Sequence, residues 1–275
     1  MRARALVEAA DLGHFWAMEE HASGGPGRFA VEGYDLLELI GAGVAGELWL
    51  ARSRRDGEQV ALRRLRLDGP RRAEQARRLV TLLTMIDHPH LQRVRESVPL
   101  GDELVLVLDH ADGGNLDQLL SGRGSLDPGE VVTTVGPVAE ALAAAHERGL
   151  VHGDINPESV LYMTDGRPLL ADLGLLGVVA GPDTLLMHGY GDPAASGPPG
   201  ASATPAGDVY SLAAVCYTAL TGIIPQPGQP RRPLKEVLPD MPPGMIHAVE
   251  AAMHPRPDRR PTAEQFAERV YAACP

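Results

Sequence analysis

The first third of the chain alternates apolar and polar residues with a period of two, a pattern that predicts β-strands. The apolar positions of this pattern are Leu37, Leu39, Leu48, Leu50, Val60 and Leu62. Between two of these runs stands Asp56-Gly57, a dipeptide typical of hairpin turns. A second strand pair is expected on either side of Gly101-Asp102, ending in the apolar run Leu104–Leu108. We therefore expect this part of the chain to be rich in β-structure.

Helical texture, with apolar residues three and four positions apart, marks five other segments. These are residues 71–86, 115–121, 128–148, 207–221 and 262–273. Asp87-His88-Pro89 ends the first of them, and the Pro- and Gly-rich stretch Gly189–Pro205 predicts an irregular loop. Because strands dominate the first third and helices the remainder, the pattern favours an α+β fold with two lobes.

The N-terminal residues form a separate unit in this pattern. Residues 1–22 contain apolar positions that suit a helix, and the glycine-rich stretch 23–27 then interrupts it as a linker would. We therefore assign residues 1–30 to a helical extension and a glycine-rich linker that precede the two lobes.

Composition restricts the kind of core the protein has and the cellular compartment in which we expect it. Aromatic residues make up 4% of the chain, so the core must rest on Leu, Val and Ala. The two cysteines, Cys216 and Cys274, are too few for a disulfide framework or a four-ligand zinc site, which points to a reducing compartment. No apolar run reaches the length of about 18 residues that a bilayer requires, and the N-terminus leads into no secretory signal. We expect a cytoplasmic location, either as a whole protein or as the cytoplasmic part of a longer one.

Charge is distributed unevenly along the chain. The net charge of −11 argues against nucleic acid as a partner, since binding to phosphates requires an excess of basic residues. Lys235 is the only lysine among 25 basic residues, and ten of the arginines lie between Arg52 and Arg78. Two interpretations remain for this segment: an ordinary solvated face, or a surface that binds an anionic or phosphorylated partner. Either interpretation expects its charges to face solvent.

Gly41, Gly43 and Gly46 form a G-x-G-x-x-G pattern. A dinucleotide-binding site would need a helix after this pattern, but strand-like residues flank it on both sides. The glycines are therefore predicted to lie at the tip of a hairpin, which suits a flap over phosphates. A glycine-rich turn without any ligand is the alternative.

Four further segments follow in order, and together with the glycine pattern they resemble the eukaryotic-like Ser/Thr protein kinases of bacteria. The segments are Val151-His152-Gly153-Asp154, Ala171-Asp172-Leu173-Gly174, Asp208-Val209-Tyr210 and Pro257-Asp258-Arg259-Arg260. The resemblance runs from about Tyr34 to Val270. It implies a bilobal protein-kinase-like fold, with a β-rich N-lobe over residues 31–111 and a helical C-lobe over residues 112–275.

The resemblance also implies roles for individual residues. Asp154 takes the position of the catalytic base and Asp172 that of the main metal ligand. Ser159 stands, as a weak substitute, where the family has a second, asparagine ligand. The nucleotide would lie among Gly41, Gly43, Gly46, Ala61, Arg63, Asp109 and Ala111. In this arrangement Leu108 is the residue at the back of the base pocket, and Asp109 and Ala111 offer backbone groups to an adenine.

Several positions of the family pattern are changed. The changed positions are Arg63 for lysine, Leu79 for the helix glutamate, Gly153 for arginine, Asn156 for lysine, Ser159 for asparagine and Ala194 for glutamate. The last change leaves Arg260 without its expected carboxylate, so Arg260 is expected to find another partner or to lie exposed. Gly153 replaces the arginine that, in the family, binds a phosphorylated residue of the segment Asp172–Pro193. This segment contains few hydroxyl groups, those of Thr184 and Tyr190, and Met187 stands where the family has a threonine. Both features argue against activation by phosphorylation of this segment.

These losses predict a catalytically impaired kinase-like domain, a pseudokinase, that acts as a regulatory or scaffolding module for a protein partner. ATP and Mg²⁺ would bind weakly if at all, because several charge-stabilising groups are missing. The alternative is an active but atypical Ser/Thr protein kinase, supported by Asp154, Asp172 and the intact glycine pattern. A composition that avoids lysine is another interpretation of Arg63 and Asn156. It explains little about Arg63, because a forked guanidinium is a poor substitute for a point charge on the phosphates, and it does not explain Leu79, Ser159 or Ala194.

Overall fold

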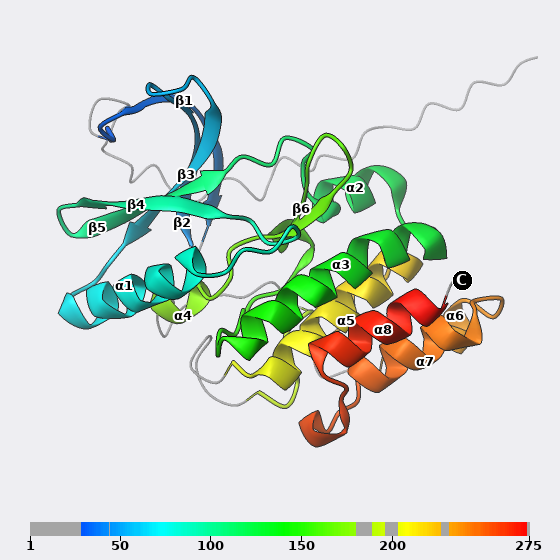
Figure 1. Ribbon diagram of the computed structural model, residues 1–275. Coiled ribbons are helices and arrows are strands. Elements are labelled where there is room, and N and C mark those ends of the chain that lie inside the picture. Colours follow the sequence, from blue (N-terminus) through cyan, green and yellow to red (C-terminus); the bar gives the residue numbers. More distant parts are fainter. Residues whose placement is uncertain (1–28, 44, 180–188, 196–202, 227–230, 274–275) are drawn as a thin grey trace, which may run out of the picture.

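A computed structural model describes residues 29–43, 45–179, 189–195, 203–226 and 231–273. Within these residues the chain forms two lobes, a sheet with one long helix and a larger group of helices (Figure 1). The α+β bilobal architecture expected from the sequence is confirmed. Most of the predicted N-terminal extension, residues 1–28, lies outside the described residues.

The smaller lobe is a five-stranded antiparallel sheet with the strand order β1-β2-β3-β5-β4. Its strands are β1 (Tyr34–Gly43), β2 (Gly46–Ser53), β3 (Gln59–Arg66), β4 (Val94–Leu100) and β5 (Glu103–Asp109). The predicted hairpin turns separate β1 from β2, β2 from β3 and β4 from β5. Val60, Ala61, Leu62 and Leu65 of β3 and the run Leu104–Leu108 of β5 are buried, because these central strands are covered on both faces.

One helix, α1 (Pro70–Thr84), connects β3 to β4 and packs beside the sheet (Figure 1). Gly69, with φ 92°, breaks the preceding strand, and Pro70 suits the first helical turn, where its missing N–H costs nothing. The helix buries Ala76, Leu79 and Leu83 at the spacing of one helical face. This face, as shown below, contacts the region around Gly174.

The larger lobe is helical. Its helices are α2 (Leu116–Arg123), α3 (Pro128–Glu147), α4 (Leu176–Val179), α5 (Pro205–Thr221), α6 (Leu234–Val237), α7 (Pro243–Ala252) and α8 (Ala263–Ala273), with single 3₁₀ turns η1 (Pro157–Ser159) and η2 (Pro257–Arg259). Nearly every residue of α5 is buried, which makes it the central helix of the lobe. Helix α3 packs against α5 and α8, and α7 packs against α5 and α8. Within the described residues, no helix combines the length and the hydropathy that a bilayer crossing requires.

A short hairpin, β6 (Val160–Tyr162) and β7 (Pro168–Leu170), places two loops next to each other. The loop containing Asp154 leads into β6, and Asp172 follows directly after β7. Since the two strands are antiparallel, the start of one and the end of the other lie at the same edge. The two aspartates singled out from the sequence are therefore brought to one place.

The five helices predicted between residues 71 and 273 are all observed, with ends shifted by at most two residues. The short helices α4 and α6 and the ten-residue helix α7 were not predicted. Helix α7 begins at Pro243 within the sequence Pro242-Pro243-Gly244, where proline and glycine favour a loop. Here proline instead occupies the start of a helix, a position that it tolerates.

Candidate functional site

The glycine pattern lies at the β1–β2 turn, as predicted. Gly46 has φ +87°, and a Cβ built on it would lie 2.0 Å from the carbonyl oxygen of Arg64 on β3. Only glycine fits there, because the neighbouring strand approaches so closely. Gly43 has open space around the position of a Cβ, and Gly41 meets only ordinary contacts with Leu48. The fold thus requires glycine at Gly46, whereas it would accept a larger residue at Gly41 and Gly43.

The residues predicted to surround a nucleobase lie on facing strands. Ala61 of β3 pairs with Leu108 of β5, and both are buried. Asp109 is the last residue of β5, and its carboxylate accepts a hydrogen bond of 2.5 Å from Nε of Arg95. Ala111 follows two residues later and is partly exposed. The structure thus places Ala61, Leu108 and the Asp109–Ala111 segment around one end of the sheet.

Arg63 binds the carboxylate of Asp172. Its Nη2 atom lies 2.8 Å from Oδ1 and 2.6 Å from Oδ2 of Asp172, and the Arg63 side chain is only 11% exposed. Nε of Arg63 is buried and has no hydrogen-bond partner. Asp172 is also the only non-glycine residue of the described ranges with a positive φ, 57°. The residue in the lysine position therefore contacts the predicted metal ligand directly.

Leu79 supplies an aliphatic contact at the position where the resemblance implies a glutamate in the family. It lies on the buried face of α1, and its Cδ1 is 2.9 Å from the position of a Cβ built on Gly174, whose φ is +73°. The nearest acidic residue of the helix, Glu74, is exposed and binds Arg77 and Arg78 instead. Helix α1 therefore offers Arg63 no carboxylate.

Asn156 and Ser159 stabilise the loop that carries Asp154. Asn156 caps the 3₁₀ turn η1 by accepting the N–H of Glu158 at 2.9 Å, and its Nδ2 donates to the carbonyl oxygen of Asp154 at 3.1 Å. Oγ of Ser159 donates to the carbonyl oxygen of Asn156 at 2.8 Å and accepts its N–H at 3.1 Å. Both side chains are buried. Their polar groups thus serve the local backbone.

Asp154 lies in a desolvated position. Burial raises the pKa of its carboxyl group to about 6, and the charge of Asp172 acts in the same direction. His152 and a hydrogen bond from Asn156 oppose this rise without cancelling it. A carboxyl group with such a pKa takes up and releases protons near neutral pH, as a general base must.

We expect the Asp154→Asn variant to be more stable than the wild type at pH 7, by roughly 2 kcal/mol. The folded-state pKa of about 6 exceeds the ordinary aspartate value of 3.8, so the folded state binds more protons between these pH values. The contribution of the Asp154 carboxyl group to the free energy of unfolding is therefore most favourable below pH 4, and this contribution is lost as the pH rises through 6. Urea unfolding of both proteins at pH 4 and pH 7 measures the difference, and a gap that stays constant with pH would contradict this assignment.

Asp208 holds the backbone beside Asp154. Its buried carboxylate accepts three hydrogen bonds of 2.8 Å, from the N–H groups of His152 and Gly153 and from Nε2 of His146. Gly153 has φ +82°, and a Cβ there would lie 3.1 Å from Cβ of Ala203. The left-handed backbone accounts for glycine at this position, where the family has arginine.

Arg260 shows the first of the two outcomes expected from the sequence, since it binds another partner. It is neither exposed nor deprived of a carboxylate, because it binds Asp192 through Nη1 and Nη2 at 2.6 and 2.7 Å. The side chains of the pair are 0% and 7% exposed. The missing glutamate at Ala194 is therefore replaced by an aspartate two residues earlier. Thr184 and Met187 of the same loop lie outside the described residues.

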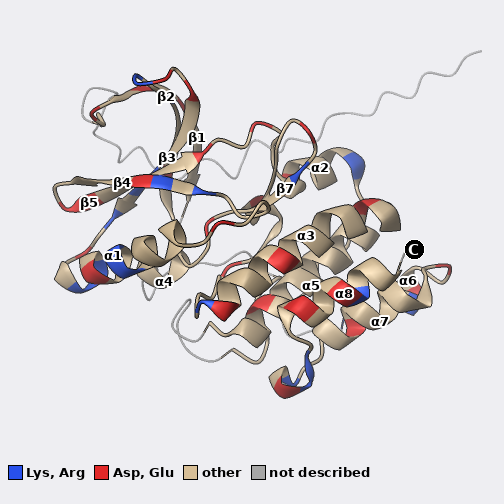
Figure 2. Ribbon diagram, in the orientation of Figure 1, with Lys and Arg blue, Asp and Glu red and all other residues tan. Residues whose placement is uncertain are grey.

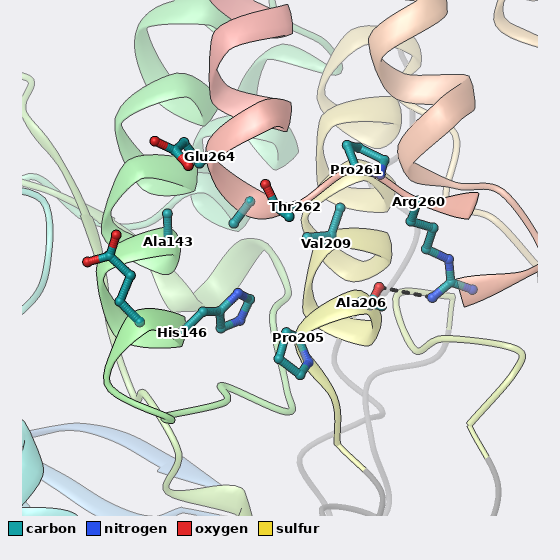
Figure 3. A pocket seen from close by; sticks show the side chains of 11 residues that line it. Ala143, His146, Pro205, Ala206, Val209, Arg260, Pro261, Thr262 and Glu264 are labelled. Atoms are coloured by element: carbon teal, nitrogen blue, oxygen red, sulfur yellow. Dashed lines mark hydrogen bonds between the residues drawn. The ribbon is translucent and has the colours of Figure 1, made fainter. Parts of the chain in front are cut away.

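A cavity of about 380 Å³ lies in the helical lobe, between α3, the start of α5 and the start of α8 (Figure 3). Its walls are mainly apolar, with Ala143, Val209 and Pro261 among them. His146 also lines it, and this side chain binds Asp208. No sequence pattern indicated this cavity.

The arginine-rich segment is less exposed than expected. Arg63, Arg64 and Arg72 have side chains only 11%, 19% and 23% exposed, so the expectation that this segment's charges face solvent is wrong for them. Arg77 and Arg78 do face solvent on α1, where one acidic position lies between basic ones (Figure 2).

Comparison with known proteins agrees with this geometry. The family model described as protein kinase domain matches residues 34–272. The chain is 32% identical to the serine/threonine-protein kinase PkaA of Streptomyces coelicolor, over 87% of this chain and 50% of that protein. PkaB of the same organism is 33% identical over 88% of this chain and 63% of its own length. The serine/threonine-protein kinase PknA of Mycobacterium tuberculosis is 30% identical, over 87% and 61%.

The chain thus spans between half and two thirds of the length of these relatives. The matched region contains the two lobes and every segment of the site described above. The chain belongs to the protein kinase domain family, among the bacterial serine/threonine kinases of eukaryotic type.

Proposed function

We propose that this domain is a catalytically impaired member of its family, a pseudokinase that acts by binding a protein partner. The observation that carries the proposal is the ion pair between Arg63 and Asp172. In the family, the basic residue of this strand pairs with an acid on the following helix and with nucleotide phosphates. Here it pairs with the aspartate that would bind the metal.

The local charges explain why Arg63 is held in this way. Leu79 supplies no negative charge on α1, so Asp172 is the carboxylate within reach of Arg63. The guanidinium neutralises the Asp172 carboxylate in a partly buried setting, where charge-assisted hydrogen bonds are strong. A phosphate group and Asp172 would have to compete for the same guanidinium.

The protein kinase family uses ATP and Mg²⁺, but the residues present do not fit the usual metal site. Asp172 is engaged by Arg63, and the Ser159 hydroxyl is engaged with the Asn156 backbone as both donor and acceptor. We therefore expect nucleotide binding, where it occurs, to be weak and to depend little on magnesium.

An active but atypical serine/threonine kinase is the second candidate. The comparisons alone favour it, because the relatives are named as kinases. Asp154 also supports it, since burial raises the pKa of this carboxyl group into the range of a working general base.

A radiolabel transfer assay separates the two candidates. With ATP, Mg²⁺ and a basic protein or casein as acceptor, we expect no incorporation above background. Charge-stabilising groups are worth roughly 3 kcal/mol each, so losing several lowers the rate by at least about four orders of magnitude. Asp154→Ala is the control, because a contaminating kinase is insensitive to it. Incorporation that disappears in this variant would establish the active kinase.

The partner remains part of the proposal. A cytoplasmic protein with an anionic or phosphorylated surface would meet the exposed arginines of the Arg52–Arg78 segment, chiefly Arg77 and Arg78 on α1. Both bind Glu74 at present, so this contact would steer association more than it would add affinity.

A further inference from the structure

Gln92 is a buried amide between the two lobes. It lies between α1 and β4 in the chain, and the residue is only 9% exposed. Its backbone N–H donates to the carbonyl oxygen of Leu170 at 2.9 Å, and the N–H of Leu170 donates to His90 at 2.8 Å. These bonds tie the Gln92 backbone to β7, directly before Asp172. These bonds therefore fix the backbone from which the Gln92 side chain extends.

The Gln92 side chain donates from Nε2 to the carbonyl oxygen of Asp109 at 2.9 Å. Gln92 lines a cavity of about 20 Å³ whose other walls are mainly apolar. Other residues that line it are Leu108, Leu170, Leu173 and Asp172. An amide in apolar surroundings is costly unless it is hydrogen-bonded, so the Asp109 carbonyl is what makes this position tolerable for Gln92.

We propose that Gln92 determines how well the Asp109–Ala111 segment accepts an adenine base, because its amide occupies the backbone acceptor that the base would use. The family resemblance assigns the backbone of Asp109 and Ala111 to an adenine. The exocyclic amine of adenine is a planar NH₂ group, and the carboxamide of Gln92 also ends in a planar NH₂ group. The chain thus presents to Asp109 a donor of the same chemical type as the ligand.

The consequence is competition rather than exclusion. A carbonyl oxygen has two lone pairs, so an adenine amine can still approach Asp109. Sharing the acceptor weakens both bonds, and displacing Gln92 leaves a buried amide without a partner. A purine that lacks the exocyclic amine donates no hydrogen bond to this carbonyl oxygen, so Gln92 does not compete with it.

The test uses nucleosides, which carry no phosphate, in the presence of a chelator. Adenosine and purine riboside, its analogue without the amine, are titrated against the full chain and against Gln92→Leu by calorimetry. We expect adenosine to bind the variant about fivefold to tenfold more tightly, the worth of one hydrogen bond. Purine riboside should change by less than about twofold, since it forms no such bond. Gln75→Leu, at an exposed glutamine of α1, is the matched control and should change neither.

Several results would overturn the proposal. These are an equal gain for both nucleosides, weaker adenosine binding in Gln92→Leu, or no adenosine binding by either protein. If Gln92→Leu does not fold, Gln92→Met keeps the unbranched shape and carries the same expectation. The proposal deepens the proposed function by locating a second cause of weak nucleotide binding. Its failure is separable, because base affinity without phosphate or metal is independent of the transfer assay and of the Arg63–Asp172 pair.

Discussion

Replacing Arg260 with alanine is expected to lower the free energy of unfolding by about 3–5 kcal/mol. The substitution leaves the Asp192 carboxylate, 7% exposed, without its guanidinium in a buried position. It also removes donors to the carbonyl oxygens of His254 and Ala206, at 2.7 and 2.9 Å, and the stacking of the guanidinium over Tyr210. These contacts join the loop around Asp192 to the start of α5 and to the segment before α8.

Urea unfolding followed by circular dichroism measures this effect, and the chain provides a matched control. Arg256 pairs with Asp258 at the same N–O distance of 2.6 Å, but both side chains are more than 60% exposed. Exposed pairs contribute little, so Arg256→Ala should unfold nearly as the wild type does. In a double-mutant cycle, Asp192→Ala and Arg260→Ala together should cost less than the sum of the two single changes. Equal unfolding curves for Arg260→Ala and Arg256→Ala would show that the buried pair is not structural.

The strands and most helices were predictable because their signal is local. Alternation at Leu37, Leu39, Leu48 and Leu50 defines β1 and β2, and the glycine hairpin between them follows from strand-like flanks on both sides. Helix α7 escaped prediction because proline signals both a loop and the first turn of a helix, and only tertiary packing decides between them.

The site was predictable in its residues but not in its contacts. The order of motifs located Asp154, Asp172 and Arg63, and counting along the chain correctly found no acid at Leu79. Counting also correctly found no acid at Ala194, but it did not identify Asp192 as the substitute, because it compares positions rather than the reach of side chains. The bond from Arg63 to Asp172 joins residues 109 positions apart, so no local pattern reports it. Gln92 gave no signal either, because a buried amide and an exposed one look alike in sequence.

Asp208→Ala is expected to cost at least about 3 kcal/mol of unfolding free energy, and its effect should be centred on the loop that carries Asp154. The change leaves the N–H groups of His152 and Gly153 and the ring of His146 without their acceptor. Each buried polar group left without a partner costs about 1–3 kcal/mol. Gly153, held at φ +82°, has little else to fix its conformation, so the loop should lose its shape before the helices do.

Hydrogen exchange followed by mass spectrometry distinguishes this local effect from a general loss of stability. In Asp208→Ala the peptide containing His152 and Gly153 should exchange faster than the core peptides of α3 and α5, even under conditions where the protein stays folded. Asp112→Ala is the control, because Asp112 also accepts a backbone and a side-chain donor, both from Thr164, but at an exposed position. That variant should leave the loop unchanged. If Asp208→Ala accelerates exchange evenly across the helical lobe, Asp208 supports the lobe as a whole, and its assigned role in holding the Asp154 loop is wrong.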